Sequence, residues 1–154
     1  MLQLTKRTEY GLIALVHMVD RRGECVSVRE ICERYPVPKR LVAEVLKDLC
    51  HVELVESQRG SNGGYTLARP AEEITLGQIV AALEGAPPLT SCEAPAVLKH
   101  GGCEVHSMCP IRSPIQRVRE GLWQMLERTT LRSLVADRGT VQFPPALVAS
   151  QSTA

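Results

Sequence analysis

Aromatic side chains are scarce in this chain of 154 residues, which has one Trp, one Phe and three Tyr. Proteins that bind single-stranded nucleic acid stack bases on aromatic side chains, so this composition offers little surface for that kind of binding. An excess of charge is also lacking, because 18 Lys and Arg residues against 17 Asp and Glu residues give a formal net charge of +1. The chain is therefore no non-specific polycation, and any contact with nucleic acid must come from a local basic face.

The sequence also has no obvious membrane span or export signal. The apolar run over residues 11–19 is too short to cross a bilayer, and no small-residue cleavage pattern follows it. We therefore expect a cytoplasmic protein with no membrane partner, whose six cysteines are thiols or metal ligands rather than a disulfide framework. Nothing resembles a catalytic triad or a paired-carboxylate site, so we expect no enzymatic activity.

The first half of the chain has the pattern of a helix-turn-helix. Apolar residues at helical spacing predict an amphipathic helix over residues 5–20, closed by two arginines and a glycine. Ser27 and Glu30 form a capping-box pattern at the start of a short second helix. A Pro-Val-Pro break then precedes a third helix, predicted over Lys39–His51. Two short helices joined by a brief turn, after a longer helix, are typical of DNA-binding proteins.

The exposed face of the third predicted helix carries mostly charged side chains. A mixed charged face is usually only solvated, but a predicted β-hairpin follows at residues 54–67 and favours DNA binding. Asn62-Gly63 is a strong turn signal in that hairpin, and the glycines do not form a phosphate-binding loop because neither Lys-Ser/Thr nor a helix follows them. The candidate DNA-binding residues are Lys39, Arg40, Ala43, Glu44, Lys47 and Arg59. Among them we expect Lys39 and Arg40 to contact bases and Arg59 to enter the minor groove.

The second half of the chain predicts helices around an irregular segment. Thr75 and Gln78 form a capping box for one helix, and a long helix begins at Ile111. That long helix carries one apolar stripe, at Ile115, Val118, Leu122, Met125 and Leu126. Such a stripe favours pairing with the same helix of a second copy in a two-fold homodimer, although the helix could also pack on its own domain. Thr130 caps a last short helix.

These patterns predict a mainly α fold with a small β-hairpin wing, that is, a winged helix-turn-helix plus a long dimerisation helix. We expect a winged helix-turn-helix domain at residues 1–86 and a cysteine loop at 87–110. The dimerisation helix and a short cap helix would then occupy residues 111–137, with a flexible tail at 138–154.

Three of the six cysteines lie in the irregular segment at residues 92–110, and they are Cys92, Cys103 and Cys109. Two prolines and two glycines exclude a continuous helix there, and a loop this long is usually functional or disordered. The thiols could hold an iron-sulfur cluster, form a zinc site with His100 or His106, or remain free or redox-active. The spacing alone does not decide, although it is not that of a zinc ribbon. Cys32 and Cys50 lie on apolar helix faces, where we expect core packing.

Several further motifs occur in a fixed order along the chain. They are residues 4–10, Leu54-Val55, residues 59–67, residues 74–76, the three loop cysteines and residues 129–131. This order resembles the Rrf2 family of bacterial winged-helix transcriptional regulators over about residues 2–137, in particular its IscR-like and NsrR-like members. The resemblance implies a homodimer on a palindromic operator in double-stranded DNA. The third helix would enter the major groove, and an iron-sulfur cluster in the loop would modulate DNA binding.

The resemblance also implies a set of cluster ligands. Cys92, Cys103 and Cys109 match the three cysteine ligands of the family. IscR-like members take a His three residues after the last Cys, where this chain has Arg112, whereas NsrR-like members use an acid from the partner subunit's first helix. We therefore expect Glu9 of the partner subunit to be the fourth ligand, with His106 and His100 as fallbacks.

Two interpretations of function follow. In the first, the cluster, of 2Fe-2S or 4Fe-4S type, senses redox state, nitric oxide or iron-sulfur status and changes DNA binding. In the second, a repressor of the same fold has no cluster and responds to cysteine oxidation, a small molecule or a partner protein. The sequence leaves open the cluster type, the signal, the target genes and the direction of regulation.

Overall fold

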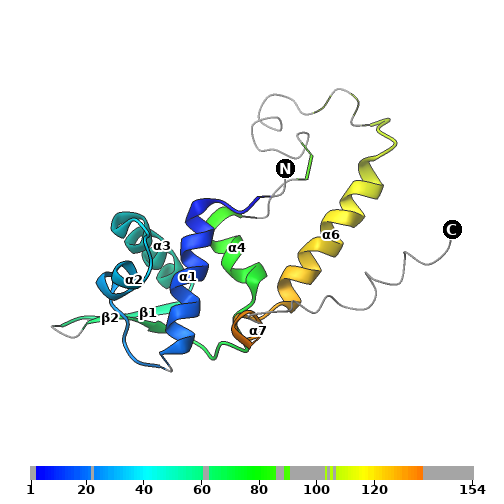
Figure 1. Cartoon of the computed structure of the whole chain (residues 1–154). Coiled ribbons are helices and arrows are strands. Elements are labelled where there is room, and N and C mark those ends of the chain that lie inside the picture. The colour runs from blue at the N-terminus through cyan, green and yellow to red at the C-terminus, as the bar shows by residue number, and fades with distance from the viewer. Residues whose placement is uncertain are drawn as a thin grey trace.

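The computed structural model describes residues 3–21, 23–60, 63–85, 89–90, 103, 105 and 107–136. Its elements in chain order are α1 (Lys6–Asp20), α2 (Val28–Arg34), α3 (Lys39–His51), β1 (Val55–Gln58), β2 (Gly64–Leu67), α4 (Leu76–Glu84), α6 (Arg112–Arg128) and α7 (Leu131–Ala136). The two strands form one antiparallel hairpin (Figure 1). The predicted fold, mainly α with a β-hairpin wing, is confirmed.

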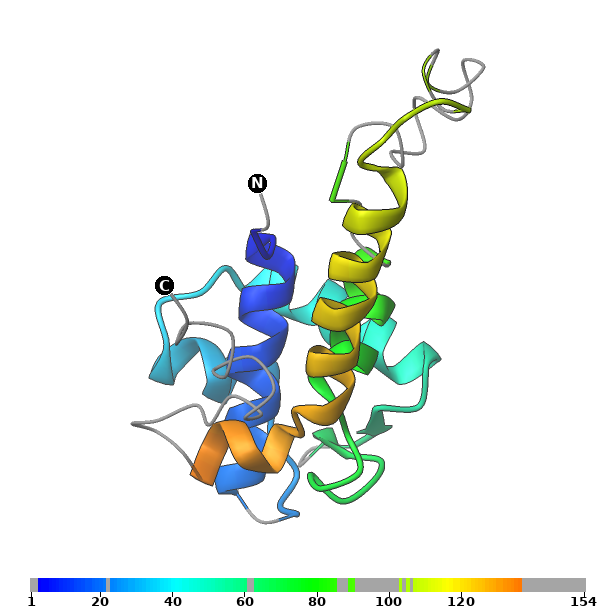
Figure 2. The same ribbon diagram turned by 90° about the vertical axis from the view of Figure 1, so that its right-hand side faces the viewer.

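Helix α1 is the centre of the head, by which we mean α1 to α4, the hairpin and α7. It contacts α3, α4, α7 and β2, and the views in Figures 1 and 2 show it running through the middle of this group. Ala14 and Leu15 of α1 are fully buried, as are Leu46 and Leu49 of α3 and Ile79 of α4. Burying a large aliphatic side chain contributes about 1.5–3 kcal/mol, so this shared core fixes the position of α3.

The predicted helix starts are largely confirmed. Thr5 caps α1 by accepting a hydrogen bond from the backbone N–H of Thr8, and Thr75 and Gln78 make the predicted capping box of α4 in both directions. The capping box predicted for α2 is only half formed. Ser27 accepts a hydrogen bond from the backbone N–H of Glu30, but the Glu30 side chain contacts His17 of α1 and Arg21 just after α1 instead.

The hairpin wing is anchored to the chain before α2. Val26 and Tyr65 exchange two backbone hydrogen bonds, of 2.9 and 2.8 Å. This close approach explains Gly64, because a Cβ there would lie 2.5 Å from the carbonyl oxygen of Val26. Strand pairing runs from Val55 opposite Leu67 to Gln58 opposite Gly64, and Asn62 of the predicted turn lies outside the described residues.

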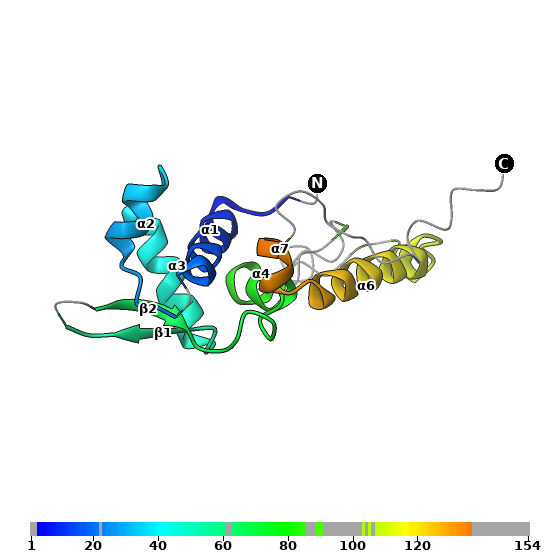
Figure 3. The same ribbon diagram turned by 60° about the horizontal axis from the view of Figure 1, so that its bottom comes forward.

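Helix α6 packs against α4 near its C-terminal end and extends beyond the head at its N-terminal end (Figures 2 and 3). The contact is close, since a Cβ on Gly77 would lie 2.9 Å from Cγ of Glu127. None of the residues of α6 is buried, and Ile111 before it and Val118 within it are 57% and 53% exposed. Of the apolar stripe predicted for this helix, the described part of the chain leaves Val118 exposed and Ile115, Leu122, Met125 and Leu126 half-buried.

Cys32 and Cys50 both pack, partly buried, against the core cluster, as predicted. Burial, together with the nearby charge of Glu56, raises the pKa of the Cys50 thiol. A thiol with a raised pKa is a poor nucleophile and metal ligand at neutral pH, which suits a structural role. Within the described ranges no helix is both long and apolar enough to span a membrane.

Candidate nucleic-acid interface and cysteine segment

Helix α3 faces solvent with the charged side chains that the sequence predicted. Lys39, Arg40, Glu44 and Lys47 are exposed, while Ala43 between them is half-buried. Arg40 is 93% exposed, and its Nε lies 3.0 Å from Oε1 of Glu44 one turn later. An exposed pair of this kind contributes little to stability, so the guanidinium of Arg40 can exchange this partner for a base or a phosphate at small cost.

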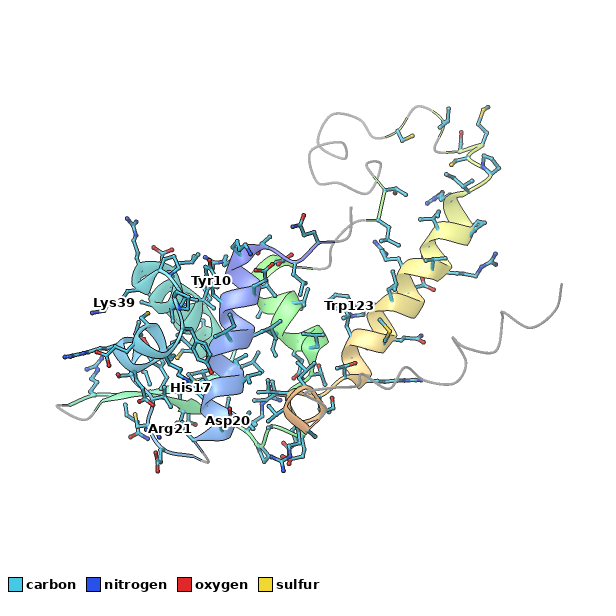
Figure 4. The ribbon with its side chains drawn as sticks, in the orientation of Figure 1. Tyr10, His17, Asp20, Arg21, Lys39 and Trp123 are labelled. Atoms are coloured by element: carbon cyan, nitrogen blue, oxygen red, sulfur yellow. The ribbon has the colours of Figure 1, made fainter. Side chains whose placement is uncertain are left out.

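The N-terminal end of α3 concentrates positive charge. Pro38 occupies the N-cap without a side-chain hydrogen bond, and the first turn contains no acidic residue. The positive end of the helix dipole therefore coincides with the cations Lys39 and Arg40. Backbone N–H groups at such an end bind phosphate oxygens readily. Figure 4 shows Lys39 on the outer side of the head, away from α6.

Helix α2, the first helix of the helix-turn-helix, is fixed to α1 by a polar network around Glu30. Oε1 of Glu30 lies 3.1 Å from Nε2 of His17 and 2.9 Å from Nε of Arg21. The His17 ring also meets the ring of Tyr35 edge-on, with centroids 5.6 Å apart. His17 lies in the last turn of α1 and Arg21 directly follows the helix (Figure 4), so this network sets the angle between the first two helices.

A second polar contact ties α1 to α3, because Arg7 pairs with Asp48 of α3. The wing lies beside α2 and α3 and extends outward from the head, as Figure 3 shows. Arg59 is exposed where the hairpin turns. The candidate residues of α3 and the wing are thus brought to one end of the head.

The cysteine segment is only partly described. Cys103 and Cys109 are half-buried free thiols that precede α6, whereas Cys92, His100 and His106 lie outside the described residues. Glu9, the predicted fourth ligand, is on the first turn of α1, where it pairs with Lys6 and raises the pKa of that lysine. No group of three or more His, Cys, Asp or Glu side chains is gathered at metal-binding distance in the described part of one chain. The ligand set therefore stays a prediction.

The start of α1 is joined to the end of α4 by Glu84, which the sequence reasoning missed. Its Oε1 accepts hydrogen bonds from the backbone N–H and the hydroxyl of Thr5, both at 2.8 Å. Burial by itself raises the pKa of Glu84, but the hydroxyls of Thr8 and Thr5 and the Thr5 N–H lower it below its ordinary value. The contact links the turn that carries Glu9 to the point where the chain leaves α4 toward the cysteine segment.

No pattern within a short stretch of sequence predicts this contact, because Thr5 and Glu84 are 79 positions apart. The Glu30 network was missed for a different reason. A glutamate three residues after a serine matches the capping-box pattern, and the nearby arginine was assigned only to the end of α1.

Comparison with known proteins decides the family. A model of the Rrf2 family, described as iron-dependent transcriptional regulators, matches residues 4–137. The chain belongs to the Rrf2 family. Its fold and sequence are also similar to those of CymR (YrzC), the global cysteine regulator of B. subtilis. The identity is 26% and the TM-score 0.69, with 88% of this chain and 98% of that chain covered.

Two further proteins are similar to this chain. IscR of T. potens shares the fold at a TM-score of 0.65 and 24% identity, covering 92% of this chain and 94% of that chain. Protein aau3 of Rhizobium meliloti (strain 1021) is 29% identical over 143 residues, 92% of this chain and 90% of that protein. The Rrf2 assignment makes this chain a transcriptional regulator with a DNA-binding winged helix.

Arg40→Ala is expected to weaken binding to a palindromic operator, selected from random duplexes by the wild-type protein, about 10- to 100-fold. Losing a good base contact costs about 1–3 kcal/mol, and 1.4 kcal/mol is tenfold. The measurement is fluorescence anisotropy at fixed salt on the operator and on a scrambled duplex. Arg117→Ala, which removes an exposed arginine of α6, is the matched control and is expected to leave the ratio of the two affinities unchanged. An equal loss of affinity on both duplexes for Arg40→Ala would show that Arg40 does not contact bases specifically.

Glu84→Gln is expected to lower the free energy of unfolding at pH 7 by about 1 kcal/mol, because neutral hydrogen bonds replace charge-assisted ones. A folded pKa below the ordinary value of 4.5 means that the carboxylate stabilises the fold above that pH. This stabilisation is lost as the pH falls through the folded pKa, so the two proteins should converge in acid. Urea titrations from pH 7 to pH 3 measure both effects.

The control for Glu84→Gln is Glu33→Gln. Glu33 forms an exposed ion pair with Arg29 on α2, so this substitution is expected to change the free energy of unfolding by less than about 0.5 kcal/mol. A Glu84→Gln protein as stable as the wild type at pH 7, or a deficit that persists unchanged in acid, would show that Glu84 does not join α1 to α4.

Proposed function

We propose that this Rrf2 protein is a homodimeric, sequence-specific DNA-binding transcriptional regulator whose affinity for its operator is modulated by an iron-sulfur cluster. The observation that carries the DNA-binding part is the exposed face of α3, with Arg40 93% exposed at the positive end of the helix and the wing beside it. In winged helix-turn-helix proteins this helix enters the major groove and the flanking elements contact the backbone.

The cysteine segment supports the cluster part through its donor chemistry. Cys103 and Cys109 are unpaired thiols on irregular backbone immediately before α6, and thiolates are the usual ligands of iron-sulfur clusters. We propose Cys92, Cys103, Cys109 and Glu9 of the partner subunit as the ligands, with His106 as a fallback, for a cluster of 2Fe-2S or 4Fe-4S type. When bound, such a cluster supplies a redox-sensitive and exchangeable cross-link between these side chains.

The chain's own residues suggest how ligation could reach the DNA-binding face. Glu9 lies one turn after Thr5, and Thr5 is held by Glu84 at the end of α4. In the same first turns of α1, Arg7 pairs with Asp48 of α3. A displacement of Glu9 would therefore move α1, and α1 is bonded directly to α3 through Arg7 and Asp48.

Dimerisation is proposed from α6. This helix follows the cysteine segment. Val118, on the stripe that the sequence predicted, and Ile111, just before the helix, are both more than half exposed. Two-fold pairing of α6 would cover the stripe and place two copies of α3 on one duplex, where half-sites lie about 34 Å apart. A change in the angle between the subunits then changes the fit to both half-sites.

A cluster-free repressor of the same fold is the second candidate, since two structural relatives, from B. subtilis and Staphylococcus aureus, are named CymR and one S. aureus structure is described as an oxidized form. In that case Cys103 and Cys109 would act as redox thiols. The two candidates differ in iron and sulfide content.

Anaerobically purified wild-type protein is expected to be brown, with stoichiometric iron and acid-labile sulfide. Glu9→Ala is expected to lose or destabilise this absorption because one ligand is removed. The measurement is a visible spectrum with iron and sulfide assays on the same sample. Glu33→Ala and Cys50→Ser, at sites outside the proposed ligand set, serve as controls and should retain the wild-type spectrum. A colourless, iron-free wild type that still binds a palindromic site would favour the cluster-free repressor.

Val118→Glu is expected to weaken dimerisation at least about tenfold, because pairing of α6 would bury an uncompensated carboxylate. Sedimentation equilibrium over a range of concentrations measures the dimer dissociation constant. Gln124→Glu adds the same charge on the opposite side of α6, where the side chain is exposed, and should leave the constant within about twofold. An unchanged dimer in Val118→Glu would place the subunit contact elsewhere.

A further inference from the structure

A cavity of about 450 Å³ opens where the end of α1, the chain between β2 and α4, and α7 come together. These segments meet at the lower edge of the head in Figure 1, and α1 contacts α7 there. Its apolar lining includes Met18, Leu67 and Pro70, and its charged lining includes Arg69 and Arg132. Ligand sites commonly enclose about 300–1,000 Å³ with mostly apolar walls and a few polar groups, which is the composition found here.

Arg69 is the unusual member of this lining. Its Nε is buried and has no hydrogen-bond partner, and the guanidinium makes no ion pair with any described residue. Buried donors in folded proteins are nearly always satisfied, so an unmatched guanidinium N–H indicates a missing partner such as a ligand or an ordered water. An anionic oxygen is the strongest acceptor for this group.

The other charges of the cavity already have partners. Glu24 pairs with Arg21 at 3.5 Å, and Glu72 pairs with Arg132 at 3.7 Å. Arg69 is thus the charged side chain of this lining that has no ion-pair partner among the described residues, so an anionic group is favoured beside its guanidinium. Arg69 also lines a second cavity, but Glu53 and Glu56 in the lining of that second cavity would repel an anion.

We propose that this cavity binds a small organic carboxylate with an apolar body, whose carboxylate is held by the guanidinium of Arg69 and whose body packs on Met18, Leu67 and Pro70. The proposal does not rest on the iron-sulfur cluster or on DNA binding. A ligand in this position would contact the end of α1, the end of the wing strand β2 and α7 at once. It would therefore stabilise one arrangement of the wing relative to the helix that follows α6.

The test uses the full-length protein and hexanoate as the probe, with backbone amide chemical shifts followed by NMR during titration. Saturable shifts are expected for hexanoate at the lining residues that have an amide N–H, which are residues 18, 19, 23, 24, 67–69, 71, 72 and 132. Hexan-1-ol, which has the same apolar body without the charge, is expected to bind at least about tenfold more weakly, because charge-assisted hydrogen bonds are much stronger than neutral ones.

Arg69→Gln is expected to weaken hexanoate binding about 10- to 100-fold, whereas Arg29→Gln, on the exposed face of α2, should leave it unchanged. If Arg69→Gln does not fold, Arg69→Lys decides, since lysine keeps the charge but loses the planar fork and should still bind several-fold more weakly. No saturable shifts with hexanoate, equal binding of hexan-1-ol, or undiminished binding by the Arg69 variant would each overturn the proposal.

Discussion

The packing of α1 into the middle of the head is the constraint on which the rest of the structure depends. Leu15 and Ala14 are fully buried in the core that α1 shares with α3 and α4, and Met18 continues the same face. Because interiors are close-packed, a shift of α1 must be followed by the helices that interdigitate with it. Several functional features of the chain are attached to this one helix. They are Glu9 near its start, Arg7 bonded to α3, the Glu30 network near its end, and the cavity at its C-terminal end.

This arrangement explains how an event far from the DNA could affect binding. The apolar core holds α3 with its charged face outward, while the polar contacts from α1 set its orientation and that of α2. Ion pairs and hydrogen bonds at half-exposed positions have small energies, so they can be exchanged without unfolding the core. A regulator needs such a combination, because a few kcal/mol between two arrangements are enough to change occupancy of an operator.

Much of the fold could be predicted from the sequence because its signals are local. The bounds of α3, Lys39–His51, follow from a proline break and an uninterrupted helical period, and the α4 capping box lies within four residues. Contacts between distant segments were not predicted. Neither the Thr5–Glu84 bond nor the approach of Gly77 to Glu127 leaves a pattern in either segment alone. The candidate DNA-binding residues of α3 could be predicted to lie together because helical spacing places them on one face of that helix. The proposed ligands have no such periodicity, and Cys92 lies outside the described residues.

The central claim is that ligation at the cysteine segment changes the affinity of α3 and the wing for DNA. The most direct measurement is operator affinity for one anaerobic preparation, divided into a sample kept intact and a sample stripped of iron with a chelator. Coupling between two sites in a regulator is typically about 5- to 150-fold, and a difference in that range is predicted, with the Glu9→Ala protein insensitive to the treatment. Equal affinities for the intact, iron-loaded sample and the stripped sample would contradict the account.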